Sequence, residues 1–297
     1  MRPNSLRGLA VIILLLADMA FAATPNRVTI LYDSFGKSPS LTMDWGFAAL
    51  VEYGGKRILF DTGNNSQIFE HNVKAAGVDL RKLDFVVMSH RHGDHMGGLA
   101  YLLKVNPTVK IYAPKERSGV YGDEQPSGTW YRKDESLPIE QRYYNGAPPE
   151  IIHMGAAWPG AHFQLIDKKT EIAPGMFLMA LVSDKPGTLE LHELSLAIRT
   201  PDGLVLVVGC SHPGVERILQ EASAIDPHIS ILLGGLHQIQ APEPEVEHIA
   251  RVLHEQYKIE HVAPGHCTGE PEFAALKRAF GEHYVYAGVG SVVDLPK

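Results

Sequence analysis

One stretch, Ser89-His90-Arg91-His92-Gly93-Asp94-His95-Met96-Gly97-Gly98, decides the fold of this chain. It follows the apolar run Phe85–Met88, which has the character of a buried strand. Its three imidazoles and one carboxylate are ligand types that suit zinc, iron, nickel and manganese. A solvated polar turn does not need three histidines at this spacing. The stretch therefore predicts a metal site on a short loop between a strand and a helix.

Polar residues follow other apolar strands of the chain in the same way. His212, His237 and His266 each come a few residues after such a strand. Because ligands of α/β proteins gather where strands end, we expect His212 and His266 to bind metal. We expect His237 to be either a ligand or a contact of the substrate. Asp61 also follows a strand, and we expect it either to orient a ligand histidine by a hydrogen bond or to cap the next helix.

Strands and helices alternate in a way typical of two similar halves of sheet plus helices packed face to face. Gly54-Gly55 predicts a hairpin between the second and third strands. Residues 114–174 lack strong periodicity, so we expect either a peripheral insertion or a lid, with residues 130–144 as an apolar wall over the metals. Strands are expected at Val28–Tyr32, Gly46–Tyr53, Arg57–Phe60, Phe85–Met88, Val109–Tyr112, Met176–Val182, Leu194–Arg199, Leu204–Val208, Ile229–Leu233 and His261–Ala263, with Tyr284–Val289 closing the chain. Helices are expected at Asn65–Ala76, Leu99–Val105, Val215–Ala224, Glu245–Gln256 and Glu272–Phe280.

The first 22 residues have the character of an export signal. Arg2 and Arg7 precede the apolar run Leu9–Ala17, and Ala20-Phe21-Ala22 is a small-x-small cleavage site. The run is shorter than the roughly 20 apolar residues that a transmembrane helix needs. We therefore expect cleavage near Ala22 and one mature domain over residues 23–297. This domain would have no stable membrane anchor and would be periplasmic or secreted.

Composition narrows the range of partners. The 297 residues carry a formal net charge of −7 and no long basic run, which argues against nucleic acid as a partner. A small-molecule substrate is expected instead, and the sequence predicts no oligomeric state. The two cysteines, Cys210 and Cys267, lie inside the histidine motifs. The sequence leaves open whether they form a disulfide or take part in the chemistry of the site.

Together these motifs resemble the metallo-β-lactamase superfamily. The resemblance rests first on Asp61-Thr62-Gly63 and on His90-x-His92-x-Asp94-His95. Leu206–Gly214, Gly234–His237 and His266–Gly269 are similar to one branch, the 7,8-dihydropterin-6-yl-methyl-4-(β-D-ribofuranosyl)aminobenzene 5′-phosphate synthase-like metal-dependent hydrolases. The resemblance implies an α/β fold, a four-layer αββα sandwich, with the metal site at one edge between the two sheets.

The resemblance also implies one or two divalent metal ions, with zinc expected and manganese or iron as alternatives. Many relatives carry a bridging Asp where this chain has Cys210, so either a thiolate binds metal here or the bridge is absent. His192 is an alternative to His212 as a ligand, and we favour His212 because the strand before it delivers it directly. The implied ligands form two sets: His90, His92 and His212 for one metal, and Asp94, His95 and His266 for the other.

The expected activity is hydrolysis of a small-molecule ester, lactone, amide or phosphoester by a metal-activated water. Asp94 would orient this water or accept its proton, and His237 would contact the substrate. Ser211 and Cys210 lack the Gly-x-Ser-x-Gly setting of a nucleophile elbow. The alternatives are metal-dependent redox or synthase-type chemistry on the same scaffold, and a non-catalytic metal-binding protein.

Overall fold

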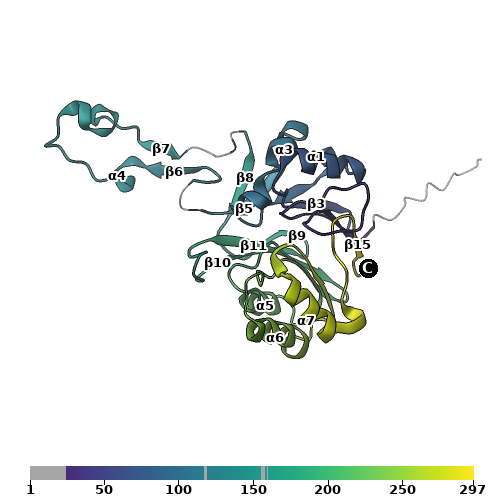
Figure 1. Ribbon diagram of the computed structural model, residues 1–297. Helices are drawn as coiled ribbons and strands as arrows, with labels where there is room; N and C mark the ends of the chain where they lie inside the picture. Colours follow the sequence, from purple (N-terminus) through teal and green to yellow (C-terminus); the bar gives the residue numbers. More distant parts are fainter. Residues whose placement is uncertain (1–24, 117–118, 155–157, 159) are drawn as a thin grey trace, which may run out of the picture.

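Two β-sheets face each other in the computed structural model, which describes residues 25–116, 119–154, 158 and 160–297 (Figure 1). The predicted signal sequence, residues 1–22, lies outside the described residues. Among the residues that are described, no helix is both long enough and apolar enough to cross a membrane.

The first sheet contains seven strands in the order β15-β1-β2-β3-β4-β5-β8. Its β2–β3 hairpin turns at Gly54-Gly55, as predicted, with φ values of +56° and +80° that favour glycine at both positions. Strands β3, β4 and β5 run parallel to one another. The strands are β1 (Arg27–Tyr32), β2 (Ala48–Tyr53), β3 (Lys56–Phe60), β4 (Phe85–Val87), β5 (Lys110–Pro114), β8 (His162–Ile166) and β15 (Val292–Asp294).

The second sheet contains six strands in the order β14-β13-β12-β11-β10-β9. Strands β12, β13 and β14 are parallel, and every residue of β12 and β13 is buried, which explains their continuous apolar sequence. The strands are β9 (Thr170–Ala173), β10 (Met176–Val182), β11 (His192–Thr200), β12 (Gly203–Val208), β13 (Ile229–Gly234) and β14 (His261–Pro264).

Three apolar cores separate four layers, which confirms the expected αββα sandwich. One core lies between the two sheets, one between the first sheet and helices α1 and α3, and one between the second sheet and helices α5, α6 and α7. The α-helices are α1 (Ser66–Ala75), α2 (Gly93–Met96), α3 (Leu99–Val105), α4 (Ser127–Trp130), α5 (Val215–Ser223), α6 (Glu243–Arg251) and α7 (Glu270–Phe280). The 3₁₀ turns are η1 (Leu80–Lys82), η2 (Ile139–Gln141), η3 (Tyr143–Gly146), η5 (His266–Thr268) and η6 (Gly281–His283), and η4 (Val252–Gln256) is a π-helical turn.

Two predicted elements differ in the structure. The helix expected at Glu245–Gln256 is divided into α6 and the π-helical turn η4. The segment Tyr284–Val289 forms only isolated bridges, and the last strand is β15. A single bridge to a neighbouring segment leaves too few ladder hydrogen bonds to define a strand, although the sequence of the segment is strand-like.

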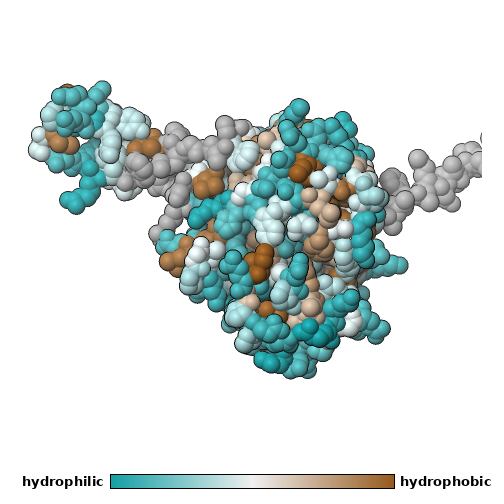
Figure 2. All heavy atoms as spheres, viewed as in Figure 1, coloured by the Kyte–Doolittle hydropathy of each residue, from teal (hydrophilic) through white to brown (hydrophobic). Residues whose placement is uncertain are grey.

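The irregular middle segment is shorter than the predicted 114–174, because β8 and β9 belong to the two main sheets. The rest includes an arm, residues 123–154, built on the antiparallel pair β6 (Asp123–Pro126) and β7 (Ile151–Met154). Figure 1 shows this arm pointing away from the body of the molecule. Figure 2 shows a largely hydrophilic surface with scattered hydrophobic side chains, some of them on the arm. The expected apolar wall, residues 130–144, lies within this projecting arm.

Candidate metal centre

The candidate site lies where five strands end at one edge between the two sheets. Strands β3 and β4 of the first sheet are parallel, as are β12, β13 and β14 of the second. The loops that follow parallel strands meet at the same edge, so residues far apart in the sequence converge there. Asp61 follows β3, residues 89–95 follow β4, residues 210–212 follow β12, His237 follows β13, and His266 follows β14.

One group of three imidazoles contains His90, His92 and His212. The Nδ1 atom of His92 lies 3.0 Å from Nε2 of His90 and 3.2 Å from Nε2 of His212. His212, and not His192, therefore completes this group, in agreement with the preferred assignment. His192 belongs to none of the potential ligand groups found among the described residues.

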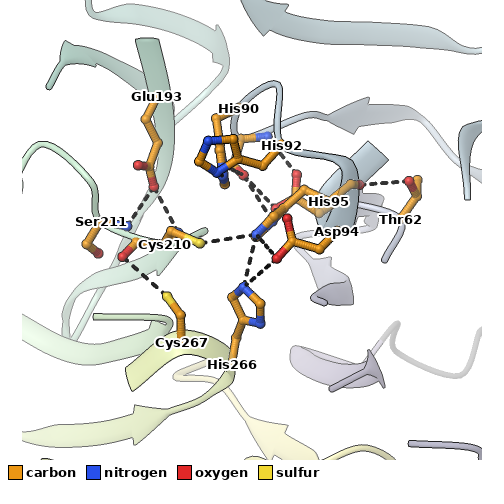
Figure 3. A network of polar contacts seen from close by, with 12 residues as sticks. Thr62, His90, His92, Asp94, His95, Glu193, Cys210, Ser211, His266 and Cys267 are labelled. Atoms are coloured by element: carbon orange, nitrogen blue, oxygen red, sulfur yellow. Dashed lines mark hydrogen bonds and ion pairs between the residues drawn. The ribbon is translucent and has the colours of Figure 1, made fainter. Parts of the chain in front are cut away.

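A second group contains Asp94, His95 and His266 (Figure 3). The Nε2 atoms of His95 and His266 are 3.1 Å apart. The Asp94 Oδ2 atom lies 3.4 Å from Nε2 of His266 and 3.9 Å from Nε2 of His95. The structure thus brings all six predicted ligands together, in the two sets that the sequence predicted.

The spacing within both groups fits a tetrahedral metal ion. Zinc–nitrogen bonds of about 2.0–2.1 Å place two ligand nitrogens of one tetrahedron about 3.3 Å apart. Three of the nitrogen–nitrogen distances in the two groups are 3.0, 3.1 and 3.2 Å, close to this value, and the Asp94 oxygen lies slightly farther from its two histidines, at 3.4 and 3.9 Å. The residues present therefore fit a pair of divalent cations.

Hydrogen bonds behind the histidines fix which ring nitrogen faces the centre. Asp61 Oδ2 lies 2.7 Å from Nδ1 of His95 and accepts a hydrogen bond of 2.6 Å from the Ser89 hydroxyl. The Ser89 Oγ atom lies in turn 2.8 Å from Nδ1 of His90. If Nδ1 of His90 and His95 donates in these contacts, Nε2 of each ring presents a lone pair to the centre, as ligation requires. Asp61 therefore contacts Nδ1 of His95, one of the predicted ligands, as the first of its two predicted roles requires.

Two buried carboxylates that the sequence analysis did not identify hold the other ligand loops. Glu193, in β11, accepts hydrogen bonds from the backbone N–H groups of Cys210, Ser211 and His212 at 2.7–2.9 Å. Asp33 accepts a hydrogen bond of 2.9 Å from the backbone N–H of His266. Burial raises the pKa of each carboxylate to about 7, although these backbone donors act in the opposite direction. Glu193 could have been identified from its position as a charged residue in the largely apolar strand β11. Asp33 could have been identified from its position directly after β1.

The backbone is strained at several site residues. Asp61, Ser211, His237 and His266 all have positive φ, between 47° and 64°. For residues other than glycine this conformation costs about 1–3 kcal/mol and persists only where surrounding contacts impose it. Close packing between loops supplies such contacts. A Cβ atom on Gly209, for example, would lie 2.3 Å from the Ser89 hydroxyl oxygen. The loops after β4 and β12 are therefore held against each other.

Electrostatics around the two groups favour a bound cation. Burial and the neighbouring imidazoles lower the pKa of His212 to about 2, so this ring is neutral at physiological pH. Burial alone would lower the pKa of His95, but the Asp61 carboxylate raises it to about 9. A site that stabilises positive charge on a buried imidazole will also stabilise a metal cation.

Both cysteines are buried free thiols next to the ligand groups. Cys210 Sγ lies 3.2 Å from Nε2 of His95, whereas Cys267 Sγ donates a 3.7 Å hydrogen bond to the carbonyl of Cys210. The exposed His237 ring packs on His212, with 4.1 Å between ring centroids, and its pKa is raised chiefly by a hydrogen bond with Cys267. His237 therefore lies beside the two predicted ligand sets but outside them. With Cys210 and Cys267 it forms a further group whose ligand atoms lie within 4.8 Å of one another.

A cavity of about 510 Å³ opens beside the second group, and His266 forms part of its wall. Three aromatic side chains and one aliphatic side chain give this cavity an apolar lining. The only ionisable side chain besides His266 in the lining is the exposed Glu270. The apolar residues are Phe35, Trp45, Ile239 and Phe273. These residues, and not the arm, supply the aromatic surface next to the histidines.

Comparison with known proteins identifies one family. The model of the Metallo-beta-lactamase superfamily matches residues 46–266. A relative from Methanocaldococcus jannaschii, named 7,8-dihydropterin-6-methyl-4-(beta-D-ribofuranosyl)-aminobenzene-5'-phosphate synthase, is 24% identical over 293 residues. That match covers 89% of this chain and 95% of the relative.

Solved structures with the metallo-beta-lactamase fold also match most of this chain. Tm1679, described as a metal-dependent hydrolase of the beta-lactamase superfamily, matches with a TM-score of 0.68 and 25% identity, and the match covers 91% of this chain and 99% of that chain. The metallo-beta-lactamase fold protein YhfI from Bacillus subtilis matches with a TM-score of 0.55 and 16% identity, over 91% of this chain and all of that one (100%).

Proposed function

Because this chain belongs to the metallo-beta-lactamase superfamily and has its fold, we propose that it is a metal-dependent hydrolase of small molecules. The scissile bond is an ester, lactone, amide or phosphoester. The cofactor is one or two divalent ions, zinc in the first place, with manganese or iron as alternatives. The observation that carries this proposal is the pair of three-residue groups, each with its ligand atoms within 4.8 Å of one another.

The residues of the site have distinct roles in this reaction. When bound, divalent ions supply Lewis acidity and lower the pKa of water toward neutrality. Asp94 is half-buried and its carboxylate lies between His95 and His266, where it can orient the attacking water or accept its proton. His237 is exposed at the edge of the site and can contact the substrate or the leaving group. Glu193 and Asp33 are positioning residues, since they hold the ligand loops and not the reacting atoms.

The aromatic cavity beside His266 is the proposed binding site for the non-reacting part of the substrate. Its Phe35, Trp45 and Phe273 side chains favour a flat apolar group. The exposed Glu270 carboxylate in its wall disfavours a second negative charge there. We therefore propose a substrate with a neutral, preferably aromatic, group next to the scissile bond.

A substrate panel with controlled metal content tests the hydrolase proposal. The purified protein is freed of metal with a chelator, reloaded with zinc, manganese or iron(II), and assayed with chromogenic esters, lactones, amides and phosphodiesters. We expect hydrolysis of one class to depend on metal and to be lost in His92→Ala together with metal. Hydrolysis that persists without metal would contradict the proposal, as would the absence of hydrolysis across the whole panel.

Removal of one aromatic side chain tests the role of the cavity. Phe273→Ala is expected to raise KM for an aromatic ester about tenfold, equivalent to about 1.4 kcal/mol, and to leave KM for an acetyl ester nearly unchanged. Phe273→Leu, which keeps the apolar volume, is the matched control and should show a smaller effect. Equal changes for both esters would place the aromatic group elsewhere.

A synthase-type reaction is the second candidate, favoured by the name of the Methanocaldococcus jannaschii relative. The two candidates differ in the origin of the new oxygen in the product. Hydrolysis in water enriched in heavy oxygen labels the product, and this label is the expected result. A product without the label, formed only when a second organic substrate is present, would favour the synthase.

A further inference from the structure

We propose that the thiolate of Cys210 is a shared ligand of the two metal positions, an inference that rests on the metal centre of the proposed function. The ligand atoms of His90, His95 and Cys210 all lie within 4.8 Å of one another. His90 belongs to the first three-residue group and His95 to the second. The sulfur therefore lies close to one predicted ligand of each set, as a shared ligand would.

The contact geometry agrees with coordination through sulfur. Zinc–sulfur bonds of about 2.3 Å and zinc–nitrogen bonds of about 2.0–2.1 Å place sulfur and nitrogen about 3.5 Å apart on one tetrahedron. Cys210 Sγ lies 3.2 Å from Nε2 of His95. Figure 3 shows the Cys210 side chain pointing at His95 and the other ligands rather than into the apolar core.

Backbone contacts on the side away from the histidines hold Cys210 in this position. Its backbone N–H donates a 2.9 Å hydrogen bond to the buried Glu193 carboxylate. The preceding Gly209 has no room for a side chain, because a Cβ atom there would contact Ser89. Cys210 itself is only 3% exposed, so solvent does not compete for its sulfur. A metal ligand needs its position fixed by hydrogen bonds and close packing of this kind, whereas a thiol that only fills space in a core does not.

Cys267 provides a natural comparison within the same chain. It is equally buried, but its thiol is directed to the carbonyl of Cys210 and interacts with His237. It belongs neither to the two three-residue groups nor to the group formed by His90, His95 and Cys210, but it lies in a further group with Cys210 and His237. Two neighbouring buried cysteines therefore have different predicted roles, and substitution of each can be compared directly.

Formation of the bridge is a simple ligand exchange. The Cys210 S–H bond breaks, its proton goes to solvent, and the sulfur electron pair binds the metal, so that nothing is oxidised or reduced. A thiolate is a softer donor than a carboxylate. The centre should therefore select zinc, cobalt or iron over manganese and magnesium.

Cobalt substitution tests the bridge without reference to turnover. Metal-free wild type, Cys210→Ser and Cys267→Ser are loaded with cobalt(II), and the near-ultraviolet sulfur-to-cobalt charge-transfer absorption is recorded. We expect the absorption in wild type and in Cys267→Ser and its loss in Cys210→Ser. Its absence from wild type, or its persistence in Cys210→Ser, would overturn the proposal.

X-ray absorption of the zinc-loaded wild type covers the case in which Cys210→Ser does not fold. A zinc–sulfur shell near 2.3 Å is expected, and it should remain in Cys267→Ser. A shell of nitrogen and oxygen alone would reject the thiolate ligand. A protein that shows the sulfur shell but hydrolyses no substrate would keep this inference and contradict the proposed function, so the two failures are distinguishable.

Discussion

The two histidines contributed by the second sheet belong to different ligand groups, which makes the groups separable by mutation. His212 lies with His90 and His92, and His266 with Asp94 and His95. We expect His212→Ala and His266→Ala each to reduce bound zinc from two ions to one per chain, with a loss of kcat of at least a hundredfold. Elemental analysis of the purified variants, with His192→Ala as the control that keeps both ions, measures this directly. Loss of both ions from each variant would instead mean that neither position holds its ion without the other.

The Glu193 carboxylate is expected to stabilise the fold as well as the site. It accepts three backbone N–H groups, and in Glu193→Gln one acceptor oxygen becomes a donor that faces another N–H. An unsatisfied buried polar group costs about 1–3 kcal/mol, so the free energy of unfolding of the metal-free protein should fall by this amount. Urea denaturation measures it, and Glu190→Gln, at an exposed position of the preceding loop, is the control. An unchanged urea midpoint would mean that these hydrogen bonds do not contribute to the free energy of unfolding.

At the residue scale, the sequence predicted the residues that the structure brings together, because histidine is conspicuous at a strand end. It did not reveal Glu193 and Asp33, since their partners are backbone groups 17 to 233 positions away. Such contacts depend on the register of β11 against the loop after β12, and on the meeting of the two sheets. Local sequence patterns do not specify either of these.

At the scale of elements, helix α7 carries a buried carboxylate with a clear pH signature. Neither side-chain oxygen of Glu272 has a hydrogen-bond partner among the described residues. Burial, followed by the charges of Glu247 and Glu245 on α6, raises its pKa from 4.5 to about 8. The unfolded chain therefore loses this proton at lower pH than the folded protein does. Stability should decrease as pH rises from about 4.5 to about 8, and the loss is complete above that range.

Glu272→Gln should remove this pH dependence. At pH 9 the variant should be more stable than wild type by about 1–3 kcal/mol, because its neutral amide avoids the buried negative charge beside Glu247 and Glu245. Near pH 4.5, where the wild-type carboxyl is protonated in the folded state, the two proteins should differ little. Urea midpoints measured across this range test the expectation, with Glu282→Gln as an exposed control. Parallel curves for wild type and variant would contradict it.

Most elements could be predicted from periodicity and turn residues, because their apolar faces pack locally against one sheet. The elements that could not be predicted depend on distant partners. Strand β8 has a mixed sequence and extends the first sheet only because β5 offers it a free edge. The predicted final strand, residues 284–289, is apolar enough for a strand but forms only isolated bridges, and β15 pairs with β1 instead.

At the scale of the whole molecule, we propose that the chain is exported and cleaved after Ala22. The basic start and the apolar run at residues 9–17 support this proposal. When the full chain is expressed in a bacterium with an outer membrane, the protein in the periplasmic or secreted fraction should begin at Ala23. Intact mass measurement identifies the new terminus, and replacement of Arg2 and Arg7 by Glu should keep the precursor inside the cell. A full-length chain in the cytoplasm of the wild-type strain would contradict export.

The four-layer architecture itself could be predicted, because the resemblance in the histidine motifs extends over nearly the whole chain. The arm could not, since residues 123–154 combine short strands and turns with no shared period. Its strands β6 and β7 pair with each other and belong to neither of the two main sheets.

The proposed metal ligands come from both sheets, with His90 and His95 on one side and His212 and His266 on the other. An ion held by donors from both sides opposes their separation, so its binding energy adds to that of the folded chain by mass action. Depletion of the ion should therefore shorten the lifetime of the protein against proteases, even when no substrate is present. The abundance of the protein would then follow the local supply of metal.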